Sequence, residues 1–171
     1  GPGFEGRQCL EDRGPCRIAV QHHVGAAEGH AVGLGELRCQ RAIGRAVVEI
    51  HQTARRQLAE NGPTELSLRA IARDLGMSPS AIYRYFASRD VLLTALIVQA
   101  YDAIGEAAEA AEAAVDRNDL EARWLTACRA ARAWSLAHPH QYSLIYGSPV
   151  PGYAAPADTI DPAGRVGLLL A

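Results

Sequence analysis

The sequence predicts an all-α protein in which a three-helix head with a helix-turn-helix precedes a partial antiparallel helical domain. Three observations support this class. Apolar residues recur at helical spacing from residue 43 onward, Gly and Pro separate the periodic segments, and Ser or Asn precedes several of them as a cap. The chain has 171 residues, 49% hydrophobic and 21% charged, which suits a globular protein with one ordinary domain or two small ones.

Residues 1–40 are Gly-rich and show no sustained apolar period, so we expect an irregular extension before a head over residues 41–88 and a helical domain over residues 89–171. The extension contains the cysteine and histidine residues Cys9, Cys16, His22, His23, His30 and Cys39. A metal cluster is the alternative interpretation, but this spacing fits no compact finger. We therefore expect no metal and no cofactor.

The first two helices have clear ends. An amphipathic helix runs from Ile43 with an apolar stripe at steps of three and four, and Gly62 followed by Pro63 should end it. Ser67 is placed to cap a second, short helix, which Gly76 should stop.

A third helix is predicted to open at Ser78, an N-cap, followed by Pro79 in the first helical position. Ile82 and Phe86, four residues apart, should face the core. The outward face then carries small, hydroxyl and basic side chains, namely Ser80, Ala81, Tyr83 and Arg84. Two short helices joined by a tight Gly-containing turn form a helix-turn-helix.

The remaining chain predicts further helices. Ser88 should cap a long helix reaching about Val115, and Asn118 with Glu121 resembles a capping box for the next, which Pro139 should end. A short helical or irregular piece over residues 141–146, a loop over 147–152 and a helix over 163–171 follow, the last opened by Asp161 and Pro162.

Charge is uneven along the chain, although the formal net charge is only −2. Residues 41–90 hold eight Arg against five acidic residues, whereas residues 91–121 hold one Arg against seven. This pattern indicates that one module faces a polyanion and the next does not.

The segment from Leu66 to Leu93, with its Tyr83-Arg84-Tyr85-Phe86 run, closely resembles the DNA-binding domain of the tetracycline-repressor-like (TetR) family of bacterial transcriptional regulators. The resemblance spans about residues 45–95, and residues 137–153 are similar to the effector domain of one subgroup. It implies a ligand-responsive regulator, a repressor that binds a palindromic double-stranded DNA operator as a homodimer.

Ten residues are predicted to contact DNA: Ser67, Arg69, Ser78, Pro79, Ser80, Ala81, Tyr83, Arg84, Tyr85 and Arg89. Small side chains at the start of the third helix let its backbone enter the major groove, and Arg84 can reach a guanine edge or a phosphate. Tyr83 and Tyr85 could donate to phosphates, with core packing as the alternative for Tyr85. Arg89 stands where the family usually has Lys, and its charge suits a phosphate contact.

The resemblance also implies an effector pocket in the C-terminal half. Candidate lining residues are Trp124, Cys128, Trp134, Tyr142, Tyr146 and Tyr153. Ordinary helix packing is the alternative for the tryptophans. His138 and His140 flank Pro139, and a role at a helix end is favoured over metal binding.

We expect a cytoplasmic protein with no membrane partner, because no stretch approaches 18 apolar residues and no secretory signal opens the chain. An enzyme is not expected, since the sequence has no Gly-rich phosphate loop, no Gly-x-Ser-x-Gly and no His-Glu-x-x-His. Family members normally continue with further helices that form the dimer, so a truncated, non-dimerising fragment or a protein-interaction module remains the alternative.

Overall fold

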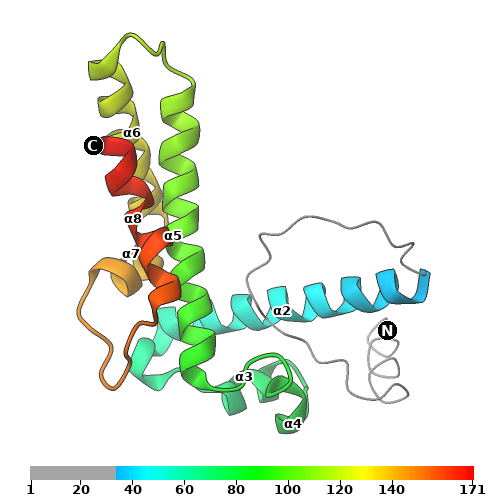
Figure 1. The fold of residues 1–171 in the computed structure, drawn as a ribbon. Coiled ribbons are helices and arrows are strands. Elements are labelled where there is room, and N and C mark those ends of the chain that lie inside the picture. The colour runs from blue at the N-terminus through cyan, green and yellow to red at the C-terminus, as the bar shows by residue number, and fades with distance from the viewer. Residues whose placement is uncertain (1–33) are drawn as a thin grey trace. The chain divides into compact units, whose positions relative to one another are not determined.

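The structure is a computed structural model that describes residues 34–171, with side chains from residue 40 onward, and helices are the only regular secondary structure in this part of the chain (Figure 1). The α-helices are α2 (Leu34–Asn61), α3 (Leu68–Asp74), α4 (Pro79–Ile82), α5 (Arg89–Ala113), α6 (Leu120–Ala137), α7 (Pro139–Tyr146) and α8 (Ile160–Leu170), with 3₁₀ turns η1 (Pro63–Glu65) and η2 (Ala157–Thr159). The chain forms two compact units. Residues 34–53 and 68–86 make the head, and residues 54–67 and 87–171 make the body.

Helix α2 begins earlier than the sequence predicted. Its first residue is Leu34, so residues 34–40, expected to be irregular, are helical, and Cys39 lies within the helix. The other cysteine and histidine residues of the extension lie outside the described residues. The C-terminal end is as predicted, because Gly62 adopts φ 78° and its N–H donates to the carbonyl of Leu58 at 3.1 Å.

The turn between α3 and α4 closes as the sequence predicted. Gly76 adopts φ 62°, Met77 N–H donates to the carbonyl of Ala72 at 2.8 Å, and Gly76 N–H donates to that of Arg73 at 3.1 Å. This pair of bonds is a Schellman motif, which uses the last free carbonyls of α3. The core of the head contains Ile50, Leu68, Ile71, Ala72, Ile82 and Phe86, all buried, and the ring of His51 lies 5.3 Å from that of Phe86.

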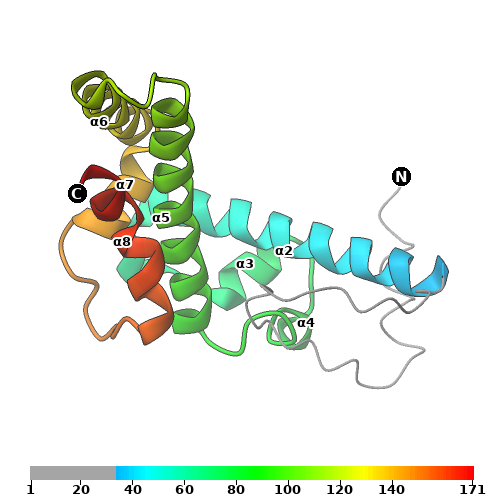
Figure 2. The ribbon, with the colours of Figure 1, turned by 45° about the horizontal axis from the view of Figure 1, so that its top comes forward.

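Helix α5 is the central element of the body, and α6 and α8 run beside it (Figures 1 and 2). Ser88 caps it as predicted, since its Oγ accepts from Val91 N–H at 3.2 Å. Tyr101 holds α7 by donating its hydroxyl to the carbonyl of Ile145 at 3.1 Å. By length and composition α5 could cross a membrane, but half of that apolar window is buried inside the structure, and the core helix of a globular protein meets the same criteria.

Helix α8 packs against α5, and one arginine links the two helices by polar contacts. Arg165 donates from Nε and Nη2 to Glu109 at 3.0 and 2.7 Å, and from Nη1 to Asp102 at 2.8 Å. Gly105 lies between these acids, and a Cβ there would come within 3.2 Å of the Cβ of Arg165, so glycine makes room for the arginine side chain. The hydrogen bond from Arg165 lowers the pKa of Glu109 below its ordinary value, because it stabilises the carboxylate.

Two predicted helix starts are corrected. Helix α6 is capped by Asp119, whose Oδ1 accepts from Ala122 N–H at 2.9 Å, whereas Asn118 N–H donates to Asp116 Oδ1 at 2.8 Å. Asn118 was predicted one position too early because it lies inside a four-residue turn, which Asp119 N–H closes by donating to the carbonyl of Asp116 at 3.1 Å. Helix α8 begins at Ile160, before the predicted Asp161-Pro162 start, because η2 leads directly into it.

Candidate nucleic-acid interface

The start of α4 carries exposed hydroxyl groups. Ser78 Oγ accepts from Ala81 N–H at 3.3 Å and lies 3.1 Å from Ser80 Oγ, so two hydroxyls mark the N-terminal end of the helix. Ser80 is exposed and Ala81 is partly exposed, whereas Ile82 is fully buried. The helix therefore presents small and hydroxyl side chains to solvent, while its opposite side packs into the core of the head, as the sequence predicted.

Helix α4 itself is short, and the exposed polar surface continues into the turn that follows. The α-helix ends at Ile82, after which Arg84 N–H donates to the carbonyl of Ala81 at 3.2 Å and Phe86 N–H to that of Ile82 at 3.0 Å. Tyr83, 45% exposed, and Arg84, also exposed, lie in this turn. The side chains of one tyrosine and one arginine therefore offer donor groups to solvent, as do the hydroxyls of Ser78 and Ser80.

Tyr85 differs from Tyr83, although the two residues are only two positions apart. Its side chain is 6% exposed and belongs to the core of the head. A ring at this depth has little surface for an external phosphate, so the structure favours the core-packing alternative over the predicted phosphate contact.

Two further predicted residues precede the turn. Arg69 is exposed on α3. Ser67 is partly buried, immediately before the first residue of α3, and its N–H donates to Gln57 Oε1 at 3.5 Å.

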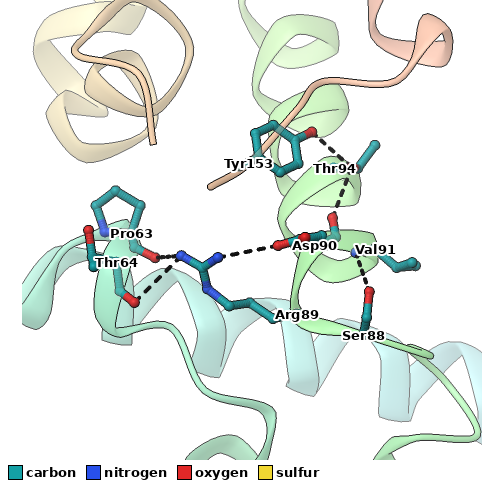
Figure 3. Close-up of polar contacts among 8 residues, drawn as sticks. All are labelled: Pro63, Thr64, Ser88, Arg89, Asp90, Val91, Thr94 and Tyr153. Carbon is teal, nitrogen blue, oxygen red and sulfur yellow. Dashed lines mark hydrogen bonds and ion pairs between the residues drawn. The ribbon is translucent and has the colours of Figure 1, made fainter. Parts of the chain in front are cut away.

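Arg89 lies in the body, at the first residue of α5, and its guanidinium is engaged within the protein (Figure 3). Nη2 donates to the carbonyl of Pro63 at 2.7 Å and more weakly to that of Thr64 at 3.5 Å, and Nη1 pairs with Asp90 Oδ1 at 3.2 Å. The predicted phosphate contact did not take these partners into account, and Pro63 and Thr64 are distant from Arg89 in sequence.

The six predicted effector-pocket residues are spread over the body, from α6 to the loop after α7. Trp124, Tyr142 and Tyr146 are exposed, but the side chain of Tyr146 is 48% exposed rather than fully so, and the desolvation of its covered part, together with nearby Tyr101 and Tyr142, raises its pKa. Tyr153 pairs its hydroxyl with Thr94 Oγ1 at 2.8 Å. The ring of Trp134 stacks at 4.9 Å on that of His138, whose Nδ1 lies 2.9 Å from the carbonyl of Trp134, so this histidine sits at a helix end as predicted. Cys128 is partly buried, and none of the six lines either of the described cavities.

The larger described cavity is a hollow of about 350 Å³ within the body. The end of α2, helix α7 and the loop after it form its walls, with Leu58, Ala59, Gly62, Pro63, His140, Ser143, Leu144, Ser148 and Val150 as lining residues. The sequence analysis did not anticipate these residues, because most of them read as ordinary apolar or turn positions. Only their proximity in the folded body brings them together.

The capped turn of the head, with a buried inner face and a polar, basic outer face, defines a helix-turn-helix protein. Residues 50–96 match the family model described as bacterial regulatory proteins, tetR family, and residues 124–171 match that described as tetracyclin repressor-like, C-terminal domain. The chain belongs to the TetR family of bacterial regulatory proteins.

Individual relatives agree with this assignment. The chain is 46% identical over 110 residues to the HTH-type transcriptional regulators Mb1846 of Mycobacterium bovis and Rv1816 of Mycobacterium tuberculosis, an alignment that covers 64% of this chain and 47% of each relative. The crystal structure of the regulatory protein SCO4313 is similar with a TM-score of 0.69 and 40% sequence identity, covering 76% of this chain and 61% of that one. The alignment thus spans about half the length of the curated relatives.

Proposed function

We propose that this protein is a transcriptional regulator that binds a palindromic DNA operator as a homodimer in the cytoplasm, acts as a repressor, and releases DNA when a small molecule binds. The proposal concerns binding rather than catalysis. It rests above all on the outer face of the α4 turn.

This face supports sequence-specific binding by its chemistry. Ser80 and Ala81 are small enough to let the helix backbone approach base edges, and Arg84 can donate two hydrogen bonds to a guanine. Tyr83, Ser78 and Arg69 are exposed donors suited to phosphate oxygens, and Pro79 itself has no N–H to leave unsatisfied at the first helical position. We leave Tyr85 out of this contact set because it is buried.

The dimer is proposed because one helix-turn-helix reads only a few base pairs. The body leaves several large apolar side chains exposed on α6 and α8, namely Leu120, Trp124, Leu136, Ile160 and Leu168. Exposed apolar surface of this kind is typical of protein interfaces, and a second copy of the chain is the partner we propose for it.

The hollow in the body is the proposed effector site, in place of the aromatic set predicted from sequence. Its walls combine apolar groups from Leu58, Leu144 and Val150 with hydroxyls from Ser143 and Ser148. This lining suits a small molecule with an apolar part and one or two hydrogen-bonding groups.

The test is fluorescence anisotropy of the full chain on duplex DNA from upstream of its own gene, against an unrelated duplex, at two salt concentrations. We expect a preference of about 10³ or more for the upstream DNA. Arg84→Ala should weaken specific binding by about tenfold or more, because one bidentate base contact is lost. Arg129→Ala, which removes an exposed arginine of α6, serves as the matched control and should have little effect. Weak binding that ignores sequence would contradict the proposal and favour a non-dimerising fragment or an interaction module.

A further inference from the structure

The chain leaves the body to form the helix-turn-helix segment and returns to the body after it, so the segment has an entry and an exit in the body. The chain enters through η1 and Ser67 before α3 begins, and it leaves after Phe86 to start α5 at Arg89. Arg89 connects the two sides. It donates from Nη2 to the carbonyl of Pro63, 26 residues earlier in the sequence, at 2.7 Å.

The surroundings of Arg89 hold its guanidinium in contacts within the body. The side chain is 29% exposed, Nη2 also lies 3.5 Å from the carbonyl of Thr64, and Nη1 pairs with Asp90 (Figure 3). Nε is buried without a hydrogen-bond partner in the structure. A buried unsatisfied donor is unfavourable, and it persists only where the remaining contacts of the group offset it. An arginine suits this position because its planar fork serves two directions at once, which a lysine ammonium on a flexible stem does less well.

Neighbouring contacts hold the first turns of α5 in place around Arg89. Ser88 Oγ accepts from Val91 N–H, and Thr94 Oγ1 donates to the carbonyl of Asp90 at 2.9 Å (Figure 3). Thr94 also meets the hydroxyl of Tyr153 at 2.8 Å, which ties this turn to the loop after α7. The exit of the helix-turn-helix segment is therefore tied within the body to both η1 and this loop.

We propose that Arg89 is a positioning residue whose contacts with Pro63, Thr64 and Asp90, here called the Arg89 clasp, set the separation between the entry and the exit of the helix-turn-helix segment. The clasp keeps α3 and α4 ready for DNA, and Arg89 acts through it rather than by touching a phosphate. This inference rests on the proposed DNA binding for its consequence, but the clasp itself can be tested without DNA.

The first experiment is hydrogen–deuterium exchange of the full chain, comparing the wild type with Arg89→Met. We expect faster exchange in residues 62–67, where Leu66 N–H bonds to Pro63 and Ser67 N–H to Gln57, and in residues 88–93. The core of the head, including Ile71 and Ile82, should exchange as before. Arg84→Met is the matched control, since it removes an exposed arginine that makes no part of the clasp, and it should leave both segments unchanged. Unchanged exchange in Arg89→Met would overturn the clasp.

The second experiment measures DNA affinity at several salt concentrations, at a temperature where every variant is folded. If the clasp positions the helix-turn-helix segment, Arg89→Met should bind upstream DNA about tenfold more weakly, which is the effect of losing one charge-assisted hydrogen bond. The dependence of log affinity on log salt concentration should keep the same slope. A phosphate contact would instead reduce the slope by about one and leave exchange unchanged, which would contradict the inference. Wild-type protein that ignores sequence would defeat the proposed function, while the exchange experiment would still decide on the clasp.

If Arg89→Met does not fold, Arg89→Lys replaces it in both experiments. It keeps the positive charge but loses the planar fork. We expect faster exchange in residues 62–67 and weaker DNA binding with an unchanged slope, whereas exchange and affinity equal to the wild type would overturn the proposal.

Discussion

The head and the body are stabilised in different ways. A core of buried apolar side chains around Phe86, together with a capping serine and a glycine turn, holds the head together, and the ring of His51 on α2 lies 5.3 Å from that of Phe86. The body depends on side chains that meet across long sequence separations, such as Arg165 with Glu109 and Tyr101 with the carbonyl of Ile145. The α4 turn of the head presents polar and basic groups outward, whereas α6 and α8 of the body leave large apolar side chains exposed. The difference indicates that the head is suited to a charged, hydrated partner and the body to apolar ones.

The largest effect that would break this comparison is loss of the head's core. Phe86→Ala should destabilise the head by about 3–5 kcal/mol, because it removes an aromatic ring that is 1% exposed. In hydrogen exchange, residues 68–86 should open while α5 and α6 remain protected. Val48→Ala, at an exposed position of α2, is the control and should change the free energy of unfolding little. Simultaneous opening of both units would show that they do not behave separately.

Helix caps provide a smaller effect within the body. Asp119→Ala should lower the free energy of unfolding by about 1 kcal/mol, because it removes the acceptor of Ala122 N–H, while Asn118→Ala should have a smaller effect. Urea denaturation followed by circular dichroism measures both variants. A larger loss of stability in Asn118→Ala than in Asp119→Ala would instead support the capping box predicted from the sequence.

The two tyrosines of the turn after α4, Tyr83 and Tyr85, sharpen the comparison between exposed and buried groups. Tyr83→Phe should weaken DNA binding by a few fold, about the effect of one lost hydrogen bond, because its exposed hydroxyl is available to a phosphate. Tyr85→Phe should leave DNA affinity unchanged, since that residue is buried. Anisotropy with the upstream duplex measures both, and equal losses would mean that Tyr85 turns outward on DNA.

The smallest effect is a pH dependence in the body. The folded-state pKa of Glu109 lies below its ordinary value of 4.5, so its ion pair with Arg165 contributes stability above that value and loses it as pH falls through the folded-state pKa. Thermal unfolding of Glu109→Gln at neutral pH and below pH 4.5 should therefore differ from the wild type more at neutral pH. Glu106→Gln, an exposed neighbour on α5, is the control. A difference that does not depend on pH would argue against the ion pair.

Much of the local structure could be predicted from the sequence. The ends of α2 and α3 at Gly62 and Gly76, and the caps Ser78 and Ser88, follow from backbone preferences within a few residues. The early start of α2 at Leu34 was missed because that segment is Gly-rich and lacks an apolar period.

The sequence by itself determined the helical class, the helix-turn-helix and the outward-facing positions of Ser80, Tyr83 and Arg84, since periodicity and capping act over short distances along one chain. Only the tertiary structure decided the burial of Tyr85, the carbonyl partners of Arg89, the pairing of Arg165 and the location of the hollow. Each of these depends on segments far apart in the sequence meeting in space. Their contacts are set by how the helices pack, and the spacing of apolar residues along the sequence does not specify that packing.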